Sequence, residues 1–82
     1  MIKREELNQL REKFYELYLY SNINIKHIEK GKLSGADADV FCEISNKFSD
    51  ECKEIDEDPY NKNNYYKGAS ESLEFVLDNW DI

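Results

Sequence analysis

Residues 7–20, with the sequence LNQLREKFYELYLY, carry the helical period that decides the fold. The apolar positions of this segment recur every three or four residues, at Leu7, Leu10, Phe14, Leu17 and Tyr18. Such spacing places them on one face of an amphipathic helix, and the glutamates of the same segment fall on the opposite face. The pattern therefore predicts a helix over about residues 3–20.

The segment 21–33 is predicted to interrupt the helical structure. Ser21, Asn22 and Asn24 bear side chains that compete with helical hydrogen bonds and favour turns. Ile23 and Ile25 alternate as in a short strand, whereas the residues before Gly31 also fit a short helix that ends at a glycine. A lone strand has no partner, so we expect an irregular linker or a short helix here.

A second helix is expected over residues 35–57. Ser34 followed by Asp37 resembles a capping box, and acidic residues suit the positive end of a helix dipole. An apolar stripe follows, formed by Val40, Phe41, Ile44, Phe48, Cys52 and Ile55. The helix is predicted to end near Asp58, because the residue before a proline avoids helical angles.

A third helix is expected over residues 64–80. Its apolar period comprises Tyr66, Ala69, Leu73, Val76, Leu77 and Trp80. Pro59 at the first turn, with Asp58 as the cap, is an alternative start. The run of asparagine and lysine at 61–64 favours the later start.

Three amphipathic helices joined by connections of a dozen residues or fewer predict an all-α fold, a small antiparallel three-helix bundle. The 82 residues are expected to form a single helical domain, residues 1–82. A helical hairpin that dimerises into four helices is the main alternative. It would bury the same apolar stripes.

The composition excludes several classes of protein. Hydrophobic residues make up 40% of the chain and charged residues 35%, which suits a folded domain better than a disordered tail. No apolar run is long enough to span a membrane, and the N-terminal residues do not resemble a signal peptide. Cys42 and Cys52, which we place about 15 Å apart on one helix, cannot bridge within it and are expected to stay reduced, with bridging between chains or metal capture as the alternatives.

Little in the sequence points to catalysis or to a cofactor. His27 is the only histidine, and it lies in the expected linker without a marked cleft around it. Ser34 and Gly35 lack the further glycines of a phosphate-binding loop. The acidic run at 50–58 lacks the glycine that a calcium loop needs at its sixth position. We therefore expect no enzyme activity, no cofactor and no metal site.

The net charge of −7 is unevenly distributed. Residues 1–33 sum to +2 and residues 34–82 to −9. The second part should repel nucleic acid and anionic lipid and attract a protein with a basic surface. On one continuous helix, a row about 27 Å long is predicted opposite the apolar stripe. It consists of Asp39, Glu43, Asp50, Glu54 and Glu57.

A second acidic row is predicted on the last helix, at Glu71, Glu74, Asp78 and Asp81. Phe75 lies on the same outward side and suits an aromatic anchor inside a polar rim. Acidic outer faces that merely keep a small bundle soluble are the alternative. The predicted partner-binding residues are Asp39, Glu43, Asp50, Glu54, Glu57, Glu71, Glu74, Phe75 and Asp78.

Four apolar residues depart from the predicted core stripes, namely Tyr15, Leu19, Phe75 and Ile82. They favour either a second packing surface within the chain or a homodimer interface. Gly68, inside the last helix, costs about 1 kcal/mol relative to alanine and would allow close backbone approach.

Residues 65–77, YYKGASESLEFVL, resemble the final helix of many short helical proteins of bacteriophages and mobile elements. In size, acidity and composition the whole chain is similar to phage anti-CRISPR and other anti-defence proteins. That resemblance implies an inhibitor in the cytoplasm of a bacterial host, which binds a nucleic-acid-binding protein such as a CRISPR effector. The pair Tyr65–Tyr66 and the acidity also resemble nuclease-toxin immunity proteins, which are an alternative beside a homodimeric regulatory module.

Overall fold

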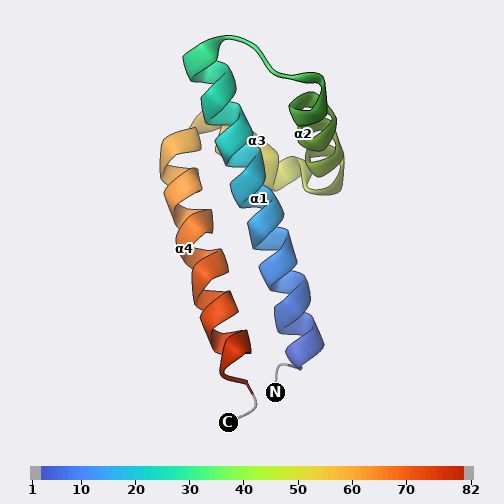
Figure 1. Cartoon of the computed structure of the whole chain (residues 1–82), viewed down its shortest axis with the longest axis vertical. Helices are drawn as coiled ribbons and strands as arrows, with labels where there is room; N and C mark the ends of the chain where they lie inside the picture. Colours follow the sequence, from blue (N-terminus) through green and yellow to red (C-terminus); the bar gives the residue numbers. More distant parts are fainter. Residues whose placement is uncertain (1–2, 81–82) are drawn as a thin grey trace.

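A computed structural model describes residues 3–80 of the chain, and this part is helical throughout, without a strand (Figure 1). The all-α class is therefore confirmed. Four helices replace the three that we expected: α1 (Arg4–Lys30), α2 (Gly35–Lys47), α3 (Ser49–Glu57) and α4 (Pro59–Asp78).

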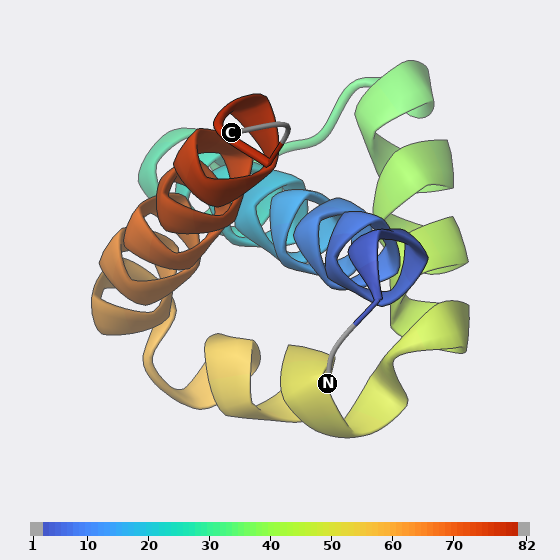
Figure 2. The same ribbon diagram turned by 90° about the horizontal axis from the view of Figure 1, so that it is seen from below.

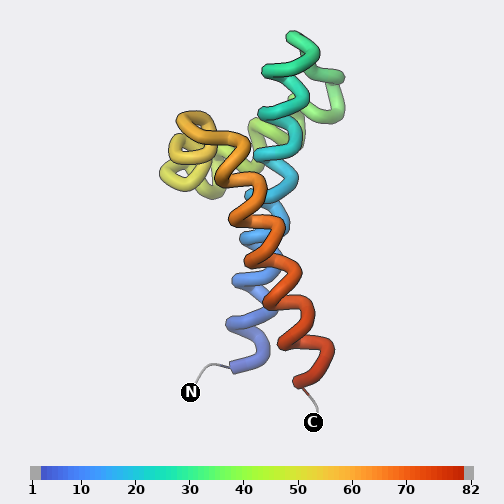
Figure 3. The backbone as a smooth tube through the Cα atoms, turned by 90° about the vertical axis from the view of Figure 1, so that its left-hand side faces the viewer, coloured from blue at the N-terminus to red at the C-terminus, as the bar shows by residue number. Residues whose placement is uncertain are grey.

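The two long helices, α1 and α4, pack side by side in antiparallel orientation, and α2 and α3 wrap around α1 at one end of this pair (Figures 1 and 2). The other end consists of α1 and α4 alone, which gives an elongated molecule of 46 × 21 × 21 Å (Figure 3). We call this two-helix end the stalk. The N-terminal turns of α1 and the last turns of α4 make up the stalk.

The core lies where all four helices meet. It consists of Leu17, Tyr20, Ile44, Cys52, Ile55 and Tyr66. The ring of Tyr20 stacks on that of Phe41 from α2, with centroids 4.1 Å apart. Burial of a large apolar side chain stabilises a fold by about 1.5–3 kcal/mol. This cluster is therefore what holds α2 and α3 against the pair of long helices, α1 and α4.

The expected linker at 21–33 is wrong, because α1 continues to Lys30. Ser21 does not end the helix: its hydroxyl donates to the carbonyl of Tyr18 and accepts from Asn63 Nδ2 on α4. Asn24 donates to Asp56 on α3. Asn24 thus finds its partner on another helix, and Ser21 adds a partner on α4 to the bond that it makes with a carbonyl of its own helix.

Gly31 ends α1 in the left-handed conformation, at φ 77°, with its amide bonded to the carbonyl of His27. The glycine was expected to cap a short helix and caps a long one instead. At the start of α2, Ser34 Oγ accepts a hydrogen bond from the amide of Asp37. This confirms the predicted cap.

The single helix expected over 35–57 is also wrong. The chain leaves helical geometry at Phe48, where φ is −132° and ψ is 57°, and then begins α3. The change of direction lets Ile44 on α2 and Cys52 and Ile55 on α3 all face α1, so that each is buried. A straight helix would carry one of its ends away from α1.

The last helix begins at Pro59 and not at residue 64. Proline occupies the first turn, where its missing amide hydrogen leaves no bond unmade. Asp58 precedes it but makes no side-chain capping bond, and its carboxylate accepts from Asn61 instead. The alternative start is therefore the one found.

Four residues that we expected in the core are partly exposed: Leu10, Val40, Val76 and Trp80. Leu10 on α1, Val76 on α4 and Trp80 just after α4 belong to the stalk. There, two helices have no third helix to cover them (Figure 3). Their exposure follows from the stalk geometry. Two packed helices cannot bury an apolar stripe that is wider than the contact between them.

Candidate protein-binding surface

The five acidic residues predicted to form one row lie on two helices. Asp39 and Glu43 are on α2, and we call them the α2 pair. Asp50, Glu54 and Glu57 are on α3, and we call them the α3 row. All five are exposed. The continuous row is therefore wrong, because Phe48 separates the two groups and α2 and α3 run in different directions (Figure 2).

The α3 row keeps its helical spacing of four and three residues and is about 10 Å long. It lies opposite the buried side of α3, which is formed by Cys52 and Ile55. The three carboxylates consequently point away from α1 and into solvent.

Glu71, Glu74 and Asp78 on α4 are exposed too, and we call them the α4 row. They lie about 120–180° around α4 from Lys62, the residue that approaches Glu54 on α3 at 3.8 Å. The α4 row and the α3 row therefore face different directions. Asp81 lies outside the described residues.

Ion pairs neutralise some of the predicted residues and leave others unpaired. Lys47 Nζ lies 2.9 Å from Glu16 and 4.0 Å from Glu43, and the hydrogen bond to Glu16 raises the pKa of Lys47. Lys62 Nζ lies 3.8 Å from a carboxylate oxygen of Glu54, which is a longer ion pair. Six predicted residues take part in no salt bridge within residues 3–80: Asp39, Asp50, Glu57, Glu71, Glu74 and Asp78.

A hollow between α1 and α4 borders the α4 row. It is lined by Arg11, Glu12, Tyr15, Ser70 and Glu74. Charges of both signs line it, so it does not extend the acidic row.

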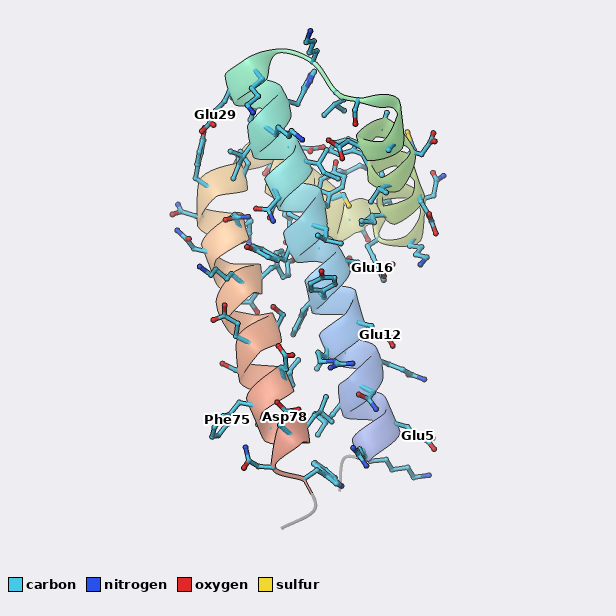
Figure 4. All side chains as sticks on the ribbon, in the orientation of Figure 1. Glu5, Glu12, Glu16, Glu29, Phe75 and Asp78 are labelled. Carbon is cyan, nitrogen blue, oxygen red and sulfur yellow. The ribbon has the colours of Figure 1, made fainter. Side chains whose placement is uncertain are left out.

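The apolar outliers do not form one patch. Phe75 is 70% exposed and points away from α1 (Figure 4). Tyr15 is exposed on α1, whereas Leu19 is partly buried and packs against the core. Ile82 lies outside the described residues. Leu19 therefore packs within the chain, whereas Tyr15 and Phe75 stay exposed on different helices.

Asp56 is a residue that the sequence did not single out. Its Oδ1 accepts from the Tyr20 hydroxyl at 2.8 Å and from Asn24 Nδ2 at 2.6 Å. Burial, and then the hydrogen bond to Asp56, raises the pKa of Tyr20. Asp56 therefore links α3 to α1 and belongs to the structure of the protein. The sequence feature that could have identified Asp56 is that it does not share the outer face of α3 with Asp50, Glu54 and Glu57.

The nucleophilic and titratable side chains are dispersed. His27 is exposed near the end of α1. Cys42 is exposed on α2 and Cys52 is buried on α3, and both are free thiols. Burial raises the pKa of Cys52 to about 11, which keeps this thiol protonated. No group of three His, Cys, Asp or Glu side chains within residues 3–80 is arranged to hold a metal ion.

Comparison of the chain with protein-family models, with curated proteins and with solved structures finds no match. In the part of the chain that the structure describes, no helix combines the length and apolar character needed to cross a lipid bilayer.

Proposed function

We propose that this chain is a binding protein without catalytic activity that docks on a basic, nucleic-acid-binding surface of another protein. The observation that supports this most is the α3 row. Asp50 and Glu57 are exposed and outside every ion pair of residues 3–80, and Glu54 has only a long contact with Lys62. Such carboxylates are free to pair with cations of a partner.

The spacing of the α3 row suits a site that binds a phosphate backbone. Side chains three and four residues apart on a helix lie about 5–6 Å from one another at Cβ. A basic groove that accommodates closely spaced phosphates can accommodate such a row, and opposite charge accelerates the encounter. The resemblance to phage anti-defence proteins makes a CRISPR effector of the bacterial host the example that we favour.

A capture experiment with charge-reversal variants tests the proposal. The tagged chain is used to capture proteins from a bacterial lysate, and the affinity of a purified partner is measured at about 50 and 500 mM salt. We expect affinity to fall steeply with salt, because exposed charges are screened beyond about 10 Å at 0.1 M. The double variant Asp50→Lys/Glu57→Lys should lower the association rate about ten-fold or more.

The matched control is Glu5→Lys/Glu12→Lys on α1, which changes the net charge by the same amount elsewhere (Figure 4). If this control weakens binding as much as the α3 variant, net charge alone drives the association, and the α3 row is not the site. Binding that does not respond to salt would exclude the acidic mechanism altogether. The double variant Glu74→Lys/Asp78→Lys tests in the same way whether the α4 row binds the partner.

A further inference from the structure

Helix α4 carries a second stripe in addition to the one that packs on α1. Tyr66, Ser70 and Leu77 face α1 and are buried. A different set of six residues recurs at spacings of four and three and is exposed throughout. We call it the outer stripe: Asn61, Tyr65, Gly68, Ser72, Phe75 and Asn79. Spacings of this kind are those of helices that pair along their length.

The outer stripe has the composition of an interface. None of its six residues is charged, in a chain of which 35% of residues are charged. Tyr65 is 58% exposed and Phe75 70%, and Val76 and Trp80 continue the uncharged surface on one flank. Interface cores are depleted in charge and enriched in aromatic side chains.

Gly68 lies in the middle of the outer stripe, and no contact within the described part of the chain requires a glycine there. A Cβ built on it meets nothing within 4 Å, and its backbone is helical. Glycine there destabilises the helix by about 0.5–1 kcal/mol relative to alanine. A glycine that the chain itself does not need is explained if another backbone or ring approaches it closely.

We propose that two copies of this chain pair through the outer stripe, with their α4 helices antiparallel about a two-fold axis between residues 71 and 72. The axis carries position 75 onto position 68 of the partner. Each Phe75 ring then lies over Gly68 of the partner subunit, and the contact occurs twice, as an isologous interface requires. Ser72 of each copy lies beside the axis, where its small side chain lets the helices approach.

The charges beside the stripe stay outside the contact. At about 100° per residue, Lys67 and the α4 row lie about 80–140° around α4 from the outer stripe. A partner helix packed on the stripe leaves these side chains in solvent, so the pairing buries no charge.

The area is at the lower end of the range for specific interfaces. The exposed parts of Tyr65, Phe75 and Val76, together with the small and amide residues of the stripe, come to roughly 600 Å² per copy, when whole aromatic side chains present about 150–250 Å². Specific interfaces bury about 1,200–2,000 Å² in total over both partners. Phe75 points away from α1 (Figure 4), and the Tyr65 ring keeps its edge-on contact with Phe14 of α1, so neither copy has to unfold to bind.

Analytical ultracentrifugation of the whole chain at increasing concentration tests the dimer. We expect a mass approaching twice 9.8 kDa by about 100 µM. Phe75→Glu should raise the dissociation constant at least ten-fold and leave the helical circular dichroism unchanged. The matched control is Tyr15→Glu, at an aromatic residue that is 53% exposed and lies outside the stripe, and this variant should dimerise normally. A monomer at every concentration, or equal loss of dimer in the control, overturns the proposal.

Disulfide trapping tests the antiparallel register. In a Cys42→Ser background, a Gly68→Cys chain mixed with a Phe75→Cys chain should form the mixed disulfide, since the two Cα atoms must approach within about 7 Å. A parallel pair would instead link position 68 to position 68, and that result would overturn the arrangement. Partner capture by the α3 row is a separate measurement, so either proposal can fail without the other.

Discussion

Removal of the hydroxyl of Tyr20 should weaken the contact between α1 and α3 by a predictable amount. In the Tyr20→Phe variant the ring remains stacked on Phe41, while Asp56 loses one of its two donors. A hydrogen bond to a charged group contributes about 1.5–3 kcal/mol. Because Asp56 is exposed and water can replace the donor, we expect the lower end, about 1.5 kcal/mol.

Asp56→Ala should cost more than Tyr20→Phe. It removes the acceptor of both Tyr20 and Asn24, and both of these residues are buried. A buried polar group left without a partner costs about 1–3 kcal/mol, so we expect about 3 kcal/mol for the pair. In a domain of this size the melting temperature should fall by about 12–24 °C, at about 4–8 °C per kcal/mol.

Urea unfolding followed by circular dichroism measures both variants, the double variant and a control. Glu57→Ala is the control, because it removes an exposed carboxylate from the same helix and should change stability by no more than about 0.5 kcal/mol. The Tyr20 and Asp56 effects should couple by about 1 kcal/mol or more in the double-mutant cycle. Additive effects, or an Asp56→Ala cost equal to that of the control, would refute the reasoning.

Three further results are expected. Leu17→Ala, at a fully buried position, should destabilise by about 2–5 kcal/mol, whereas Phe75→Ala should cost less than about 1 kcal/mol in dilute solution; urea unfolding orders the two, and an equal cost would place Phe75 in the core. The folded-state pKa of Cys52 lies above its ordinary value of 9.0, so the stability it contributes is complete below pH 9.0 and is lost as the pH rises through about 11; the urea midpoint should fall over this range, and less so in Cys52→Ala. A thiol reagent should modify Cys42 rapidly in the native protein and Cys52 only after unfolding, and equal rates would contradict the burial of Cys52.

Sequence patterns predicted correctly those features of the helices that depend only on residues close by in the chain. The apolar period of residues 7–20 and the cap at Ser34 depend on neighbours within one or two turns, and both were confirmed. The end of α1 could not be predicted in this way. Ser21 and Asn24 remain helical because their partners are Asn63 and Asp56, 42 and 32 residues away. A sequence pattern does not show where such partners lie.

The break at Phe48 shows a second kind of limit. Neither glycine nor proline marks it, and the apolar stripe runs through it without a change of period. The break arises because a straight helix could not keep Ile44 and Ile55 both in contact with α1. For the candidate surface, the helical period assigned the acidic residues to outer faces, but the division of Asp39 and Glu43 from the α3 row depended on this tertiary packing.

The pairing of the first helix with the last has a consequence for how fast the chain folds. Helices of this length form within about a microsecond, whereas contacts such as that of Ser21 with Asn63 must first close a loop of 42 residues. Loop closure, and not helix formation, should therefore limit the folding rate, in line with the effect of contact order. The equilibrium depends much less on loop length, since each doubling of a loop costs only about 0.6 kcal/mol. The connection between Gly31 and Ser34 should accordingly accept inserted residues that slow folding but leave the folded protein almost as stable.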